Sequence, residues 1–272
     1  ITDDGRFILF STQTEDLSER PFSKNSLFRL DLQSMKTDTI WKDERFASGA
    51  TFSPDGSQLL ITGGAEAFNS IGLNINPGQI ANSYDTQAFI MDIASKKIDP
   101  ITKYFNPSIN STTWNKKDNL IYLRVEEKDC ENMYSFNPKN KLFRKLPLKE
   151  ELIRSFSVAD KELIAAYAGS GTSNSRRAYL LDLKKMNSTL LADPYDEKLS
   201  KMTLGEVKDW NFVSSAGDTI QGRYYLPPHF DASKKYPLVV YFYGGTSPTQ
   251  RTFETTYPLH VYAANDYVVY TL

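Results

Sequence analysis

The chain has 272 residues, of which 40% are hydrophobic and 24% are charged, a composition typical of folded globular proteins. Its 32 basic and 33 acidic residues leave a net charge of -1, which gives no electrostatic basis for binding nucleic acid or an anionic membrane surface. No apolar run reaches the roughly 18 to 20 residues of a membrane span, and the first residues lack a signal-peptide pattern, so we expect the sequence to begin inside a larger protein.

A polar turn followed by an alternating apolar strand recurs four times in the first two hundred residues. Its turn is of the Asp-Gly type in the first two copies, which is a strong local signal for a reversal of the chain. Taking Asp4, Asp55, Asp118 and Asp160 as anchors, the copies are 51, 63 and 42 residues apart. The copies are TDDGRFILFS from Thr2, SPDGSQLLITG from Ser53, NKKDNLIYLRV from Asn115 and VADKELIAAYA from Val158.

Each copy is followed by a second phrase, a strand that ends in Asp or Asn and continues into a hairpin. Its anchors are Asp31, Asp92, Asn137 and Asp182, which are 61, 45 and 45 residues apart. A short side-chain oxygen at this corner can accept a hydrogen bond from the backbone of the turn. The alternation of apolar and polar residues predicts half-buried antiparallel strands.

Units of about 40 to 45 residues with four short strands each are typical of β-propeller blades. We expect about four blades here, the first of them incomplete, with insertions near 13–25 and 64–85. The SPDG phrase resembles the turn of TolB-like and peptidase propellers, and none of the units has the Trp-Asp pair of WD repeats.

The pattern changes after residue 200. Two strands over 206–213 and 219–226 are predicted to form a hairpin around Gly217, and two prolines at 227–228 end the second strand. A continuous apolar strand follows from Leu238 to Tyr243, then a helix over 253–264 and another buried strand over 267–272. This order favours an α/β domain whose sheet begins with an antiparallel pair.

The segment from Gly222 to Gly245, GRYYLPPHFDASKKYPLVVYFYGG, resembles the start of the catalytic domain of the prolyl oligopeptidase family, particularly its dipeptidyl-peptidase and acylaminoacyl-peptidase branches. That family places a β-propeller before an α/β-hydrolase domain, so the resemblance covers essentially the whole chain. It implies C-terminal propeller blades over 1–200 and the beginning of a hydrolase domain over 201–272. The family commonly has proline after the glycine pair, and Thr246 departs from that pattern.

The resemblance implies a role for the residues at the end of the apolar strand. In the family motif, the tyrosine before the glycine pair donates its hydroxyl to the oxyanion, and the matching residue is Tyr243. The alternative is that Tyr243 only packs against the sheet. Gly244 and Gly245 would let the backbone turn sharply and approach the substrate.

The catalytic triad itself is not expected within this sequence. A serine nucleophile needs a G-x-S-x-G turn, with Asp and His later in the chain. The segment around Ser247, GTSPT, lacks the second glycine of this pattern, so Ser247 is interpreted as a loop residue. His229 and His260 precede any nucleophile strand, so both are interpreted as structural or exposed. We expect this chain alone to be inactive, its nucleophile lying beyond Leu272.

Other charged and reactive side chains are given ordinary roles. The pairs Glu126/Glu127 and Glu150/Glu151 are interpreted as solvated charge, and Arg176 and Arg177 as residues of a loop. Cys130 is the only cysteine and is interpreted as a structural thiol, which fits cytoplasm and periplasm alike, although a periplasmic or secreted location is slightly favoured. No metal-ligand or nucleotide motif occurs, so no cofactor is expected.

The resulting hypothesis is that this chain is part of a serine peptidase that hydrolyses oligopeptides. A peptide is the expected partner, and the parent protein could form a homodimer through its hydrolase domain. The competing hypothesis is a propeller-based binding or scaffold module with a vestigial hydrolase segment.

Overall fold

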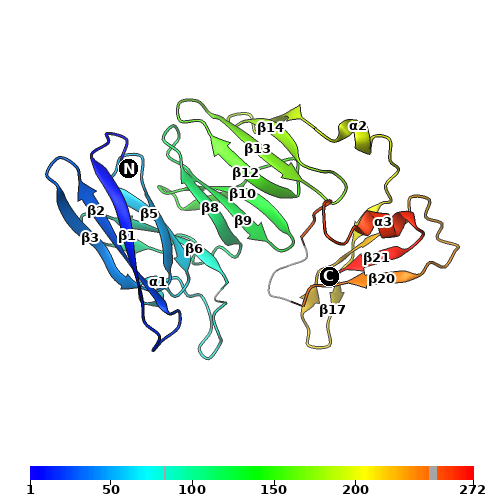
Figure 1. Ribbon diagram of the computed structural model, residues 1–272, viewed down its shortest axis with the longest axis horizontal. Coiled ribbons are helices and arrows are strands. Elements are labelled where there is room, and N and C mark those ends of the chain that lie inside the picture. Colours follow the sequence, from blue (N-terminus) through cyan, green and yellow to red (C-terminus); the bar gives the residue numbers. More distant parts are fainter. Residues whose placement is uncertain (83, 245–249) are drawn as a thin grey trace. The chain divides into compact units, whose positions relative to one another are not determined.

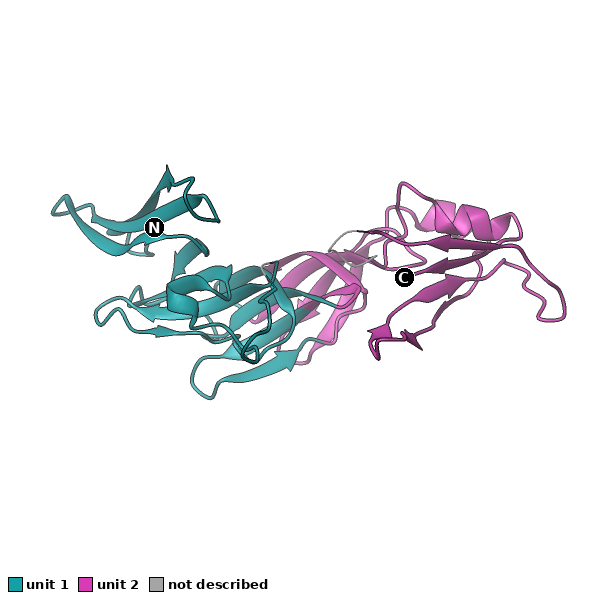
Figure 2. Cartoon of the chain, turned by 90° about the horizontal axis from the view of Figure 1, so that it is seen from below, with its two compact units in different colours: residues 1–127, 133–146, 159–162 teal, residues 128–132, 147–158, 163–272 magenta. Residues whose placement is uncertain are grey.

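The computed structural model describes residues 1–82, 84–244 and 250–272 and consists mainly of short β-strands (Figure 1). It divides into two compact units (Figure 2). Unit 1 comprises residues 1–127, 133–146 and 159–162, and unit 2 comprises residues 128–132, 147–158 and 163–272. The boundary expected between residues 200 and 201 separates propeller blades from the start of a hydrolase domain, and that boundary stays a prediction.

Unit 1 contains a three-stranded sheet and then four-stranded blades, as the repeated phrases predict. The three-stranded sheet consists of β1 (Phe7–Glu15), β2 (Ser23–Asp31) and β3 (Lys36–Glu44). The next blade consists of β4 (Ala47–Phe52), β5 (Gln58–Gly64), β6 (Thr86–Asp92) and β7 (Ile98–Asp99), with α1 (Ala67–Ser70) between β5 and β6. The third blade consists of β8 (Ser108–Trp114), β9 (Ile121–Glu127), β10 (Cys130–Asn137) and β11 (Leu142–Lys145).

The strands of unit 1 bury alternating apolar side chains. One core cluster includes Leu59, Ile61, Phe89 and Met91 on β5 and β6, which are at most 2% exposed. A second cluster uses residues of the opposite parity on the same strands, such as Leu60, together with residues of β8 and β9. Both faces of the second blade are therefore covered, which explains why its strands contain near-continuous apolar runs.

The recurring Asp or Asn forms the hairpin corners in the way the sequence predicts. The side chains of Asp31, Asp92, Asn137 and Asp182 each accept a hydrogen bond from a backbone N–H two or three residues later, at 2.8 to 2.9 Å. The residue four positions after each anchor has a positive φ of 53° to 58°. One turn chemistry therefore closes all four hairpins.

Unit 2 contains the fourth blade and a separate small sheet. The blade consists of β12 (Leu152–Val158), β13 (Ile164–Ser170), β14 (Arg177–Asp182) and β15 (Asn187–Ala192), and α2 (Asp196–Leu199) follows it. Its first strand, β12, also pairs in parallel with β10, where Leu152 lies opposite Glu131. The small sheet has the order β16-β19-β21-β20, with bounds β16 (Val207–Asp209), β19 (Arg223–Tyr225), β20 (Leu238–Tyr241) and β21 (Val268–Thr271). A two-stranded ribbon, β17 (Phe212–Val213) and β18 (Thr219–Ile220), extends from it.

The small sheet confirms the predicted change to an α/β pattern. It begins with the antiparallel pair β16 and β19, and β20 runs parallel to β21 with α3 (Leu259–Ala264) connecting them. Tyr225, Leu259, Ala263 and Val269 form its buried core. The hairpin turn at Gly217 has φ +90°, a conformation that favours glycine.

Three predicted elements of unit 2 are wrong in extent. The expected strand over 206–213 is interrupted at Trp210 and Asn211, and the expected strand over 219–226 is interrupted at residues 221 and 222. At these interruptions the Asn211 side-chain oxygen accepts the Gly222 N–H at 3.2 Å. The expected helix over 253–264 begins only at Leu259. Pro258 disfavours a helical conformation for the residue before it, so the helix cannot extend further back.

The two predicted insertions have different structures. Residues 13–15 and 23–25 lengthen β1 and β2, whose pairing extends to Glu15 opposite Ser23, and residues 16–22 connect the two strands. The described part of 64–85 contains α1 and irregular chain. No helix in the described ranges is long and apolar enough to cross a membrane.

Candidate functional site

Tyr243 lies just beyond the carboxyl end of β20, the strand before the predicted oxyanion loop. Alternation along β20 turns Val239 and Tyr241 toward the core of the small sheet, whereas Leu238 and Val240 are exposed. The Tyr243 side chain is 63% exposed, so this strand end is accessible to a ligand. Among the described residues, no atom lies within 4 Å of a Cβ placed on Gly244. Gly245 and Ser247 lie outside the described residues.

A network of arginines and carboxylates holds the chain that resumes at Gln250. The Arg223 guanidinium, 2% exposed, donates to Asp129 at 3.0 Å and to the Gln250 carbonyl at 2.6 Å. Arg251 donates to the same Asp129 oxygen at 2.9 Å and to Glu151 at 2.9 Å. Asp129, in the turn between β9 and β10, therefore accepts from two guanidinium groups and holds residues 250 and 251, while Glu151 holds Arg251 at the start of the fourth blade.

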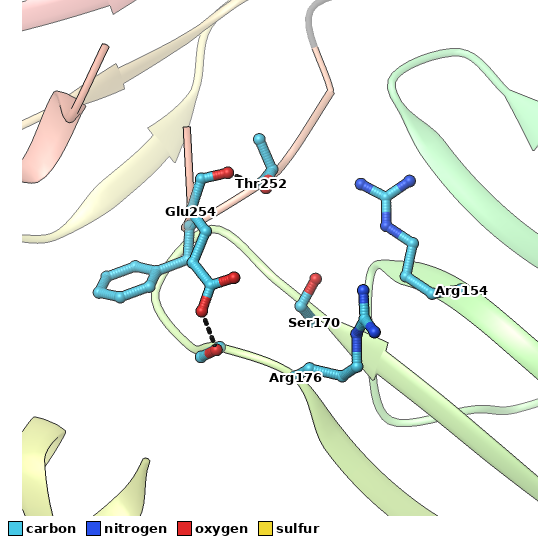
Figure 3. Close-up of a pocket in the computed structure, with 7 residues that line it drawn as sticks. Arg154, Ser170, Arg176, Thr252 and Glu254 are labelled. Carbon is cyan, nitrogen blue, oxygen red and sulfur yellow. Dashed lines mark hydrogen bonds between the residues drawn. The ribbon is translucent and has the colours of Figure 1, made fainter. Parts of the chain in front are cut away.

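A pocket of about 370 Å³ lies beside this network (Figure 3). Arg154 and Ser170 contribute from β12 and β13, Ser175 and Arg176 from the loop before β14, and residues 252–254 from the chain after the network. The Ser175 hydroxyl donates to the Glu254 carboxylate, which places that carboxylate in the wall of the pocket. All of these residues belong to unit 2.

Glu150 is a buried structural carboxylate, so its interpretation as solvated charge is wrong. Its side chain is only 3% exposed. It accepts hydrogen bonds from the Tyr179 hydroxyl at 2.5 Å and from Asn174 at 2.8 Å, with Arg177 at 3.9 Å. Glu150 and Glu151 precede β12, which begins at Leu152.

His260 is structural, in agreement with its sequence interpretation, and His229 is exposed. The Nε2 atom of His260 lies 2.8 Å from the Thr172 carbonyl oxygen, and its buried Nδ1 has no hydrogen-bond partner among the described residues. An N–H on Nε2 satisfies the carbonyl and leaves Nδ1 without a proton. Burial lowers the pKa of His260 and outweighs the opposing effect of the Thr172 carbonyl.

We expect His260 to make the stability of unit 2 depend on pH. The unfolded chain takes up a proton near the ordinary pKa of 6.5, whereas the folded chain resists protonation of Nδ1. The unfolded state therefore binds more protons as the pH falls through this value, and the free energy of unfolding decreases. Urea unfolding at pH 7.5 and pH 5.5 measures this loss. His260→Gln should reduce the difference between the two pH values, and an unchanged difference would assign it to other groups.

Cys130 behaves as the structural thiol that the sequence predicts. It lies at the start of β10, and burial together with the nearby Asp129 raises the pKa of its thiol to about 11. A thiol with this pKa is a poor nucleophile at neutral pH. Within the part of the chain that the structure describes, no three His, Cys, Asp or Glu side chains are grouped so that they could hold a metal ion.

Comparisons with known proteins identify peptidases as relatives. No family model matches the chain. It is 40% identical over 74 residues to venom dipeptidyl peptidase 4 of Apis mellifera, which covers 27% of this chain and 9% of that protein. It is 28% identical over 142 residues to dipeptidyl-peptidase 5 of Porphyromonas endodontalis, which covers 51% of this chain and 20% of that protein.

Solved structures show the same fold over almost the whole chain. An acylaminoacyl peptidase from Pyrococcus horikoshii aligns with 98% of the chain at a TM-score of 0.72 and 17% identity, and a puromycin hydrolase aligns with all of it at 0.65 and 15%. The chain is related to the prolyl oligopeptidase family. It covers 38% and 40% of those two solved chains.

The relationship to the prolyl oligopeptidase family confirms the fold expected from the sequence, which is propeller blades followed by the first part of an α/β-hydrolase domain. Sequence reasoning missed the Asp129 network and the pocket. The partners in the network are up to 122 residues apart in the chain, a separation that no local pattern can detect. The only available signal was the pair of arginines at 176 and 177.

Proposed function

We propose that this chain is part of a serine peptidase that hydrolyses oligopeptides and that Tyr243 contributes to its oxyanion hole. The observation that carries the proposal is the position of Tyr243, exposed and directly after a parallel strand that leads through α3 into β21. The peptidase relatives support the reaction class. The resemblance to dipeptidyl-peptidases and acylaminoacyl peptidases favours oligopeptides as substrates.

The chemistry of peptide hydrolysis explains why an exposed tyrosine is useful at this position. Attack of a serine hydroxyl on the peptide carbonyl transfers negative charge to the carbonyl oxygen. A fixed hydroxyl that donates a hydrogen bond to this oxygen stabilises the transition state more than the bound substrate. Gly244 has no side chain, and no described residue lies within 4 Å of a Cβ placed there, which would favour close approach of a peptide backbone.

The remaining catalytic groups are proposed to lie outside the sequence given. This sequence has no G-x-S-x-G turn, and its two histidines are accounted for as exposed or structural. We therefore propose that this chain supplies propeller blades, over 1–200, and the oxyanion loop, within 201–272, but not the Ser, Asp and His of the triad.

A comparison of this chain with its parent protein tests the proposal. The chain alone should not release fluorophore from an aminoacyl or dipeptidyl aminomethylcoumarin substrate. The parent should release it, and a serine-directed phosphonate should abolish that activity. Turnover by the chain alone that the phosphonate blocks would show that the nucleophile lies within it. A parent that binds peptides without cleaving them would favour the binding-module hypothesis.

A further inference from the structure

The pocket beside the Asp129 network has an arginine without a partner. Arg176 is exposed and makes no hydrogen bond or ion pair with any described residue, although it lines the pocket. Arg154 also lines the pocket, and it donates to Glu131 at 2.6 Å and to Gln250 at 3.0 Å. A guanidinium has five N–H donors, so Arg154 retains donors beyond these two bonds. Figure 3 shows the two guanidinium groups on the same side of the pocket.

The opposite wall of the pocket carries a single negative charge. Glu254 lies there, held by the Ser175 hydroxyl, and the Thr252 hydroxyl donates to the Glu254 backbone carbonyl at 2.8 Å. This carboxylate would repel a doubly charged phosphate more strongly than a singly charged carboxylate. It can also accept a hydrogen bond from an amide N–H. The combination favours a carboxylate ligand that carries amide donors.

A second, more apolar pocket adjoins the first. It encloses about 460 Å³ and shares Ser175, Arg176 and Glu254 with the first pocket. Its other lining residues are mostly apolar and include Pro194 and Tyr195. Both volumes are in the range of sites that bind small ligands. A ligand that places an anionic group beside Arg176 could therefore place an apolar group in the second pocket.

We propose that Arg176, with Arg154 beside it, binds a carboxylate of a peptide whose neighbouring apolar side chain enters the second pocket. Arginine suits this role because its planar fork matches the two oxygens of a carboxylate. The Glu254 carboxylate accepts an N–H of the same peptide. The inference rests on the proposed function only in taking a peptide as the ligand.

Binding of labelled peptides to this chain tests the proposal without any hydrolysis. The probes are fluorescein-labelled Ala-Ala-Leu with a free carboxylate and the same peptide as its C-terminal amide, with dissociation constants measured by fluorescence anisotropy. A second pair, the amides of Ala-Glu-Leu and Ala-Gln-Leu, distinguishes a side-chain carboxylate from a terminal one. We expect the acid member of at least one pair to bind about tenfold more tightly than its neutral partner.

The variants separate a specific site from general attraction to positive charge. Arg176→Gln should abolish the preference for the acid, and since Arg176 is exposed this change should leave the unfolding midpoint unaltered. Arg144→Gln removes the same charge from an exposed position on β11 and should retain the preference. Equal affinity for both members of each pair, absence of binding, or a preference that survives in Arg176→Gln would overturn the proposal. Because the readout is binding, its failure would leave the role of Tyr243 untouched.

Discussion

Replacing Tyr243 with phenylalanine should lower kcat of the parent peptidase by about 10²- to 10³-fold, the typical cost of removing one oxyanion donor. The change deletes only the hydroxyl and keeps the ring, so any packing by the ring is retained. KM should change little, because the hydrogen bond forms mainly in the transition state. Steady-state kinetics with a fluorogenic peptide measure both constants.

Tyr257→Phe is the matched control for this experiment. Tyr257 is also exposed and lies in the same unit, where its ring is 5.3 Å from that of Tyr241. Its hydroxyl has no assigned role, so kcat should stay close to that of the unsubstituted enzyme. If Tyr243→Phe and Tyr257→Phe both leave kcat unchanged, Tyr243 has only the packing role that was the alternative interpretation.

Replacing Asp129 with alanine should destabilise unit 2 by about 3 to 5 kcal/mol, the usual result of removing one member of a buried ion pair. The Arg223 side chain is 2% exposed and would lose a carboxylate partner at 3.0 Å. Arg251 would lose the same partner at 2.9 Å. Urea unfolding measures the change in free energy, and hydrogen exchange of the β19 amides localises it to the small sheet.

Asp209→Ala provides the control, because it removes the same charge from a neighbour of the same arginine. Asp209 contacts Arg251 at 2.5 Å, but its side chain is 58% exposed. Exposed ion pairs contribute about 0 to 1 kcal/mol, so this variant should be close to the unsubstituted chain in stability. If both substitutions lowered the free energy of unfolding equally, the contact of Asp129 with the buried Arg223 would not be the source of its stabilising effect.

The network also has a consequence for the proposed oxyanion loop. Tyr243 and Gly244 precede residues 245–249, and Gln250 and Arg251 follow them. Arg223 and Asp129 hold this second end through the Gln250 carbonyl and the Arg251 guanidinium. Loss of Asp129 should therefore affect the positions of Gln250 and Arg251 as well as stability. Arg251 lies outside the family motif, and its contact with Asp129 makes it a positioning residue for the chain that follows the proposed oxyanion loop.

The predictions that succeeded depend on short-range chemistry. The hairpin corners at Asp31, Asp92, Asn137 and Asp182 could be found because each anchor bonds to a backbone N–H only two or three residues away. The helix before β21 begins six residues later than predicted, at Leu259. Pro258 disfavours a helical conformation for the residue before it, which is also a short-range effect.

Local sequence patterns were sufficient to predict the blades, the antiparallel start of the small sheet and the position of Tyr243 at a strand end. Each of these follows from alternation, turn residues or a local motif, whose physical causes act over a few residues. The burial of Glu150, the two arginines on Asp129 and the position of Arg176 at a pocket arise only when the chain folds. These depend on which charged groups meet after folding, and pairs such as Asp129 and Arg223 are 94 residues apart.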